Sequence, residues 1–213
     1  MPTRLTARLN EILPRITSPN FLSGDGIGNE IPFYIFDYPA EHELMIREHL
    51  HSILKALSVK KPSLKFEHVN LFHCLLSYIK ERGYFDKMLG KEKQLKERFA
   101  SDPAEADGKI VRSIQAIAGA DELAEFFAKT VLSKKPGLIL VSGIGSVYPV
   151  IRTHEFLNNL HKYMGQAPLI LFYPGVYDKT TLKLFGKSSI GFDSSSSDRQ
   201  RKAKYYRAFR LID

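Results

Sequence analysis

The chain has 213 residues, of which 44% are hydrophobic and 25% are charged. These values exclude a fibrous or largely disordered protein and fit a globular one. We expect a single α/β domain over residues 1–213. The net charge is +8. Residues 1–132 carry 18 Lys and Arg against 18 Asp and Glu, and residues 133–213 carry 13 against 5. This asymmetry indicates a nucleic-acid surface, an acidic partner or only a well-solvated face.

The single cysteine and the N-terminal residues narrow the class of protein further. Cys74 is the only cysteine, so no disulfide can form within the chain. It lies in an apolar run, where a buried small side chain is expected more often than a reactive thiol. The N-terminus has charges where a signal peptide would be apolar, and no stretch reaches the length of a membrane span. We therefore expect a cytoplasmic protein that does not enter the membrane.

The N-terminal half alternates helical and strand patterns. Apolar residues at helical spacing predict a helix from Thr3 toward Ile16, bent or ended near Pro14. A glycine-rich loop at 23–30 leads to a predicted buried strand at 31–37. The next expected elements are a helix at 40–57 with Leu44 on its buried side, a strand at 64–71 and a helix from Phe72 to Ile79. Gly83 and Gly90 are expected to interrupt the segment that follows. A charged helix is expected at 92–99, and a long helical stretch at 107–132 with a break near Gly119.

The clearest unit of the sequence lies between Pro136 and Phe172. Residues 138–141 form a short apolar strand, residues 142–147 a turn, residues 148–164 a helix with Tyr163 facing inward, and residues 168–172 another apolar strand. Two apolar strands joined by a helix indicate a parallel pair that is covered on both faces. The whole pattern predicts a three-layer α/β/α sandwich around a mostly parallel sheet, Rossmann-like or P-loop-like but without nucleotide-binding motifs.

The C-terminal part contains less regular structure. We expect a brief strand or turn at 182–185, a flexible loop at 187–198 that is rich in serine, and an edge strand at 205–212. Basic and aromatic residues alternate between Asp198 and Arg210. The basic groups of such a segment neutralise phosphates and its aromatic rings stack on bases. Alternatively, the aromatic residues pack on the sheet while the basic side chains remain in solvent.

Gly143 and Gly145 lie between a strand and a helix, where phosphate-binding loops are found. The dinucleotide fingerprint needs a third glycine, but that position is Tyr148. The sequence also lacks the Gly-Lys-Ser/Thr ending of a P-loop. A degenerate nucleotide-binding domain therefore remains an alternative, and a tight turn is the simpler interpretation.

Other catalytic signatures are weak. His42-Glu43 and His154-Glu155 lack the second histidine of a zinc-binding helix. Ser142 and Ser146 do not lie in a Gly-x-Ser-x-Gly elbow. We expect no catalytic residues, no metal and no cofactor.

Several segments together resemble the BrxB family of BREX phage-defence systems. They are residues 26–33, the run Leu140-Val-Ser-Gly-Ile-Gly-Ser-Val-Tyr-Pro149 with Arg152-Thr-His154 and 157–161, the run Leu169-Ile-Leu-Phe-Tyr-Pro-Gly175 with Tyr177, then 184–186 and 205–210. The resemblance spans nearly the whole chain in order, and the length suits a complete family member.

The resemblance implies a small BREX component without known enzymatic activity. Such a system combines a PglZ-type protein of the alkaline-phosphatase superfamily, a large ATPase and an adenine methyltransferase, and it marks host DNA and blocks phage replication. We expect an adaptor that binds other BREX proteins, most directly the PglZ-type protein. A nucleic-acid-binding module that uses the basic C-terminal residues is the main alternative.

The candidate interaction surface combines the two strand ends and the basic run. The C-terminal ends of neighbouring parallel strands usually build the sites of α/β proteins. The expected residues are Gly143, Gly145, Tyr148, Tyr173, Tyr177, Arg199, Arg201, Lys202 and Lys204.

Overall fold

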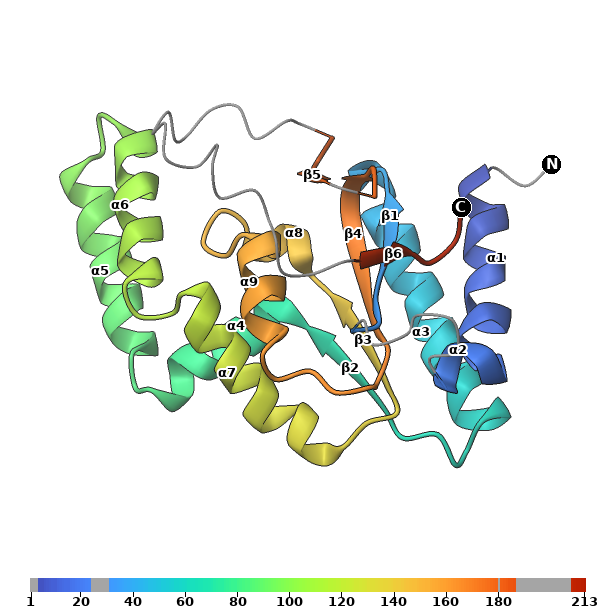
Figure 1. The fold of residues 1–213 in the computed structure, drawn as a ribbon. Coiled ribbons are helices and arrows are strands. Elements are labelled where there is room, and N and C mark those ends of the chain that lie inside the picture. Colours follow the sequence, from blue (N-terminus) through green and yellow to red (C-terminus); the bar gives the residue numbers. More distant parts are fainter. Residues whose placement is uncertain (1–3, 24–30, 180, 187–207) are drawn as a thin grey trace.

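The computed structural model describes residues 4–23, 31–179, 181–186 and 208–213 (Figure 1). Its α-helices are α1 (Arg4–Thr17), α2 (Pro19–Ser23), α3 (Glu43–Lys60), α4 (Leu71–Glu81), α5 (Phe85–Arg98), α6 (Pro103–Gln115), α7 (Ala120–Thr130), α8 (Ile144–Val147) and α9 (Thr153–Leu160). Short 3-10 turns are η1 (Ala40–His42) and η2 (Leu132–Lys134). The strands are β1 (Phe33–Tyr38), β2 (Phe66–Asn70), β3 (Leu138–Ser142), β4 (Leu169–Tyr177), β5 (Leu182–Leu184) and β6 (Ala208–Arg210).

The sheet is parallel along its main path, in the order β2-β3-β4-β1-β6. This order differs from the 3-2-1-4-5-6 order of dinucleotide-binding domains. The short strand β5 pairs with the end of β4 and runs antiparallel to it. The parallel pairing predicted for 138–141 and 168–172 is confirmed, because Ile139 lies beside Leu169 and Val141 beside Leu171.

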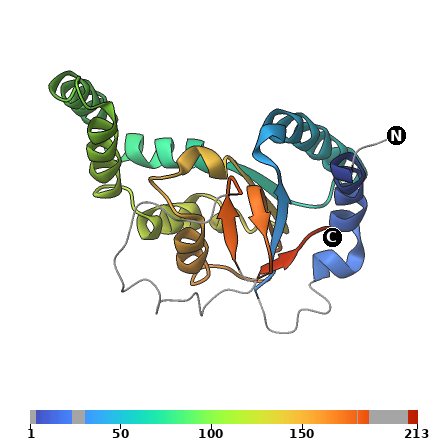
Figure 2. The same cartoon turned by 90° about the horizontal axis from the view of Figure 1, so that it is seen from above.

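Helices cover both faces of the sheet, which confirms the three-layer sandwich (Figures 1 and 2). Alternate residues of each strand point to opposite faces, so each central strand feeds two cores. Phe36, Leu140 and Ile170 pack with α1, α2 and α3 on one face. Ile35, Val141 and Leu171 pack with α4, α7, α8 and α9 on the other. Burial on both faces explains why β1, β3 and β4 read as continuous apolar runs.

Helices α5 and α6 form a hairpin that projects away from the sheet (Figure 2). Between residues 82 and 117 only Ala106 is buried. The predicted interruption at Gly90 is wrong, because Gly90 lies inside α5 with nothing within 4 Å of where a Cβ would be. A single exposed glycine costs about 1 kcal/mol in a helix, which neighbouring turns tolerate.

Two other predicted boundaries also need correction. The helix expected from Tyr148 begins only at Thr153, because Tyr148 is extended, as residues before proline usually are. The strand expected to end at Phe172 continues to Tyr177, because β5 pairs with its last three residues. A Cβ at Gly175 would lie 2.2 Å from the carbonyl oxygen of Lys183, so only glycine allows this close pairing.

Two side chains predicted to face the core are exposed, namely Leu44 on α3 and Tyr163 beyond the end of α9. The other main predictions agree with the structure. Helix α1 runs through Pro14 to Thr17, β1 is buried along its whole length, and α7 begins after Gly119. The predicted edge strand appears as β6 beside β1. The expected flexible loop at 187–198 lies outside the described residues.

Candidate interaction surface at the C-terminal edge of the sheet

Strands β1 and β4 end at the place where an open α/β sheet usually binds a ligand. Ligands of such sheets lie beyond the C-terminal ends of neighbouring strands whose connections lead to opposite faces. Helix α3, which follows β1, packs on one face, whereas α8 and α9, which precede β4, pack on the other. The C-terminal ends of β1 and β4 are therefore where this topology favours a functional site.

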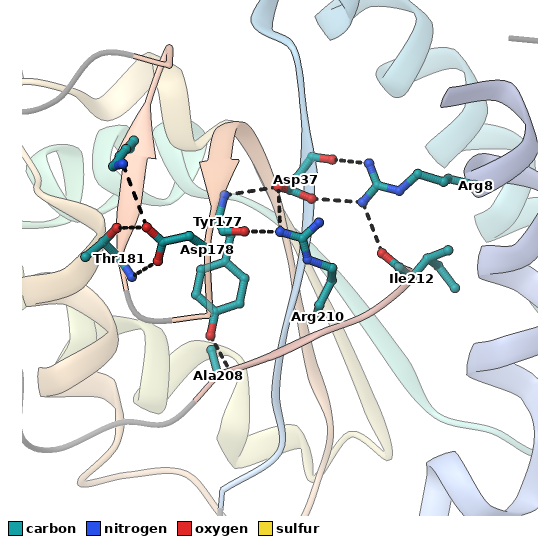
Figure 3. Close-up of polar contacts among 9 residues, drawn as sticks. Arg8, Asp37, Tyr177, Asp178, Thr181, Ala208, Arg210 and Ile212 are labelled. Atoms are coloured by element: carbon teal, nitrogen blue, oxygen red, sulfur yellow. Dashed lines mark hydrogen bonds and ion pairs between the residues drawn. The ribbon is translucent and has the colours of Figure 1, made fainter. Parts of the chain in front are cut away.

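Asp37 lies near the end of β1 and contacts the neighbouring strand ends (Figure 3). Its side chain is buried, with 7% of the residue exposed. One carboxylate oxygen accepts a hydrogen bond of 2.8 Å from Arg8 on α1, and the other accepts one of 3.0 Å from the backbone N–H of Tyr177 on β4. The guanidinium of Arg210 on β6 lies 3.5 Å from the second oxygen. One carboxylate thus joins α1, β1, β4 and β6.

The two arginines extend this network to the backbone. Arg8 also donates to the carbonyl oxygens of Asp37, at 2.9 Å, and of Ile212, at 3.1 Å. Arg210 donates a hydrogen bond to the carbonyl oxygen of Tyr177. The hydroxyl of Tyr177 in turn donates to the carbonyl oxygen of Ala208, at 2.6 Å. These contacts fix the end of β4 against β1 and β6. We call Arg8, Asp37, Tyr177 and Arg210 the clasp.

The end of β4 and strand β5 form a hairpin beyond the parallel part of the sheet. Phe185 donates its backbone N–H to the carbonyl oxygen of Pro174, which places the two side chains on the same face of the hairpin. Helix α8 packs against this face, because a Cβ at Gly145 would lie 3.1 Å from both of these side chains. Tyr148, just after α8, meets the ring of Phe185 edge-on, with centroids 6.3 Å apart.

This packing leaves a group of large apolar side chains in solvent. Tyr148 is 49% exposed, Phe185 is 45% exposed, and Val176, next to Pro174 on the same face of β4, is 47% exposed. We call Tyr148, Val176 and Phe185 the edge patch. Tyr148 and Phe185 lie in the turns directly after α8 and β5, and Val176 lies in β4. Scattered exposed apolar residues are common, but a neighbouring group of large ones is typical of an interaction site.

The structure brings together only some of the residues that the sequence singled out. Gly143, Gly145 and Tyr148 lie at one strand end, and Tyr173 and Tyr177 lie in the adjacent strand β4. Tyr173 and Tyr177 are 1% and 3% exposed, so their side chains belong to the core rather than to a surface. Both side chains pack into the core that includes α8, and only Val176 among the residues of β4 is exposed. Arg199, Arg201, Lys202 and Lys204 lie outside the described residues.

Gly143 acts in a turn between two strand ends. Its φ of +74° lies in the left-handed region that favours glycine. A Cβ there would lie 2.5 Å from the side-chain oxygen of Asn70, which accepts hydrogen bonds from Phe72 and His73 and so caps α4. The close approach of β3 to this cap requires glycine, which gives the turn a structural reason.

Ser142 and His68 make the other polar contact at this edge. The imidazole Nε2 lies 2.9 Å from the hydroxyl oxygen. Desolvation, with a smaller effect of His73, lowers the pKa of His68 below its usual value. Ser142 itself is buried. Within the described part of the chain, no three His, Cys, Asp or Glu side chains are placed to hold a metal ion.

The sequence did not point to three of the four clasp residues, Arg8, Asp37 and Arg210, or to two of the three residues of the edge patch. In the sequence, Asp37 is recognisable only as an acidic residue at the end of an apolar strand. That position is the one local feature that could have identified it. Arg8 lies on a helix 29 positions earlier, so only the fold shows that the two meet. Val176 and Phe185 stand next to predicted residues, but their exposure depends on the hairpin.

Comparisons with known proteins decide the family. The sequence pattern of the family described as "BREX protein BrxB" matches residues 67–211. A protein of that name from Bacillus cereus (strain H3081.97) is 33% identical over 210 residues, covering 99% of this chain and 98% of the relative. The chain belongs to the BrxB family. A BrxB protein from Escherichia coli O9:H4 (strain HS) is 32% identical over 208 residues, covering 98% of this chain and 92% of the relative.

No solved structure matches this chain. The family membership makes the protein a component of a BREX system, as the resemblance implied. Over the described residues, no helix is long and apolar enough to span a bilayer.

Proposed function

We propose that this BrxB protein is a non-catalytic adaptor that binds another BREX protein through the edge patch. The observation that carries the proposal is the exposure of Tyr148 and Phe185, whose rings are in contact, and of Val176 on the hairpin that leads to Phe185. Aromatic residues that are held rigidly contribute much of the binding energy of protein interfaces, because little side-chain entropy is lost on binding.

The clasp supports an adaptor over the nucleotide-binding alternative. In an active α/β enzyme the crevice between such strands holds ligand. Here Asp37 is already bound by Arg8, Arg210 and the N–H of Tyr177, and the hairpin of β4 and β5 continues over the strand ends. The same contacts hold the hairpin in place, and a fixed hairpin presents Val176 and Phe185 at low entropic cost.

Within the BREX system, the PglZ-type protein is the direct partner that we propose. This choice rests on the family resemblance, and the edge patch fits a protein partner of this kind because its recognition groups are apolar and aromatic. Three large side chains at the centre of an interface suit a standard protein contact, in which a few anchors are surrounded by a polar rim.

Co-expression with the other BREX proteins, followed by size-exclusion chromatography at moderate salt, tests the proposal. We expect co-elution with the PglZ-type protein, and loss of it in a Tyr148→Ser/Phe185→Ser variant. A Leu44→Ser/Val59→Ser variant is the matched control, because these apolar residues are 73% and 75% exposed on α3, away from the patch. Separate elution of the wild-type protein from every BREX component would contradict the adaptor function, and equal loss in both variants would contradict the role of the patch.

A further inference from the structure

We propose that strand β2 pairs in antiparallel orientation with β2 of a second copy of this chain, and that the two copies form a symmetric dimer. This inference concerns a border of the sheet that is separated from β4 by β3, and it does not depend on the adaptor function. Within the described sheet, β2 is the last strand on its side, and β3 lies beside it (Figure 1).

The outer edge of β2 carries hydrogen-bonding groups that no described strand uses. The carbonyl oxygen of Lys65 accepts a hydrogen bond of 2.7 Å from the N–H of Gly137, so the backbone groups of Lys65 point toward β3. The backbone groups of successive residues in a strand point to opposite sides, and those of Phe66 and His68 therefore point away from β3. Among the described strands, only β3 pairs with β2.

No described element fills the space beside the start of β2. A hollow of about 390 Å³ lies there, lined by Leu64, Lys65, Phe66, Glu67, Lys134 and Pro136. Lys65 and His68 are exposed, and Phe66 and Glu67 are partly exposed. An edge with free backbone groups and open space beside it is suited to the addition of a strand.

The charges of β2 are complementary to those of a second β2 strand. When Phe66 of each copy lies on the two-fold axis, Lys65 of each copy lies opposite Glu67 of the other. Opposite charges at facing positions stabilise a strand pair, and like charges destabilise it. Moving the axis by one residue in either direction places Lys65 opposite Lys65 or Glu67 opposite Glu67. The charges therefore select the register centred on Phe66.

The backbone groups agree with the same register. Because those of Phe66 point to the open edge, the two Phe66 residues on the axis exchange two hydrogen bonds. Lys65 and Glu67 then face each other as a pair without backbone hydrogen bonds, where side chains approach most closely and Cα atoms are about 4.5 Å apart. Lys134 of the same chain already lies 2.9 Å from the carboxylate of Glu67, so Lys65 of the second copy adds another cation beside it.

The edge patch takes no part in this pairing. Its residues belong to β4 and to the turns after α8 and β5, not to β2. A dimer would carry two edge patches and so bind two partner molecules, a consequence that rests on the proposed function. The pairing of β2 itself is tested without any partner.

Sedimentation velocity of the purified full chain, at concentrations from about 1 to 100 μM, tests the inference. We expect a species of twice the chain mass of 24.2 kDa. Lys65→Glu and Glu67→Lys should each raise the dissociation constant of the dimer at least about 10-fold, because each turns two opposite-charge pairs into two like-charge pairs. An equimolar mixture of the two variants should dimerise about as tightly as the wild type, since every glutamate then faces a lysine.

Lys55→Glu is the matched control, because it makes the same change of charge at an exposed position of α3 and should leave the dimer unchanged. Circular dichroism checks that each variant is folded. A wild-type chain that stays monomeric at the highest concentration would overturn the inference. Dimers that persist equally in both single variants would place the interface elsewhere, and folded variants that do not dimerise when mixed would overturn the register.

A cysteine on the axis gives an independent test of the register. The Cα atoms of a hydrogen-bonded antiparallel pair are about 5.5 Å apart, which is within the range of a disulfide. Phe66→Cys should therefore form a disulfide between copies under oxidising conditions, whereas Lys55→Cys should not. A monomeric wild-type chain whose binding to another BREX protein is lost in Lys65→Glu would assign the edge to that protein and overturn the dimer.

Discussion

Replacing Asp37 with alanine should destabilise the fold strongly, because it removes the centre of the clasp. The variant leaves Arg8 and Arg210 without their shared carboxylate, and their side chains are only 14% and 24% exposed. It also leaves the N–H of Tyr177 without its acceptor. Removing one partner of a buried ion pair costs about 3–5 kcal/mol. Since water reaches part of both arginines, we expect the lower end, about 3 kcal/mol.

Urea and thermal unfolding of the purified chain measure this effect. For a chain of this length, about 3 kcal/mol corresponds to a fall of roughly 6–12 °C in Tm. Asp37→Asn should fall between the wild type and Asp37→Ala, because the amide keeps an acceptor but loses the charge. Glu125→Ala is a suitable control, since its ion pair with Lys129 is exposed and should contribute little to stability.

A double-mutant cycle tests whether the clasp acts as a unit. The Arg8→Ala/Asp37→Ala variant should be destabilised by less than the sum of the two single variants, because the second change removes an ion pair that the first has already broken. An unfolding free energy of Asp37→Ala within about 0.5 kcal/mol of the wild type would refute the reasoning, since a buried carboxylate with these partners could not then be important for stability.

Three further predictions concern single positions. Gly143→Ala should lower the unfolding free energy measured in urea by about 2 kcal/mol, because alanine is strained at a positive φ and its Cβ would displace the cap at Asn70. Gly90→Ala should raise the unfolding free energy by about 0.5–1 kcal/mol, because its Cβ would lie in open space. Equal effects of the two changes would contradict the geometry. Burial raises the pKa of the Cys74 thiol to about 12, so Ellman's reagent at pH 8 should react only as fast as the protein opens, and rapid reaction of the native protein would be contrary evidence. The pKa of His68 is lower in the folded chain than in the unfolded chain, so as the pH falls the unfolded chain binds a proton more readily than the folded one. The unfolding free energy should therefore fall as the pH drops below about 6.5. A His68→Gln variant with the same pH dependence would exclude this cause.

The layers of the fold could be predicted from the sequence, because the strands are apolar on both faces. The run at 138–141 has no polar side chain, which indicates a buried parallel strand and therefore helices on both sides. Helix α1 was recognisable from Leu5, Leu9 and Ile12 at helical spacing. These patterns are local in the sequence, so they can be recognised without knowing which elements pack against them.

The site could be predicted only in part, because its residues meet through contacts that are distant in sequence. The C-terminal ends of β3 and β4 were correctly expected to be neighbours. However, Tyr173 and Tyr177 were expected at a surface, and the extension of β4 into a hairpin turns them inward. The exposure of Val176 depends on the same hairpin. The link between Asp37 and Arg8 depends on how α1 packs, which no short pattern encodes.

Titration calorimetry of the purified protein with its BREX partner measures the affinity to which the edge patch should contribute. Tyr148→Ser/Phe185→Ser should weaken binding to the PglZ-type protein at least 100-fold, because two anchors that become buried in the interface contribute several kcal/mol. Leu44→Ser/Val59→Ser should bind like the wild type. An edge-patch variant that binds as tightly as the wild type would contradict the claim that this surface makes the protein an adaptor.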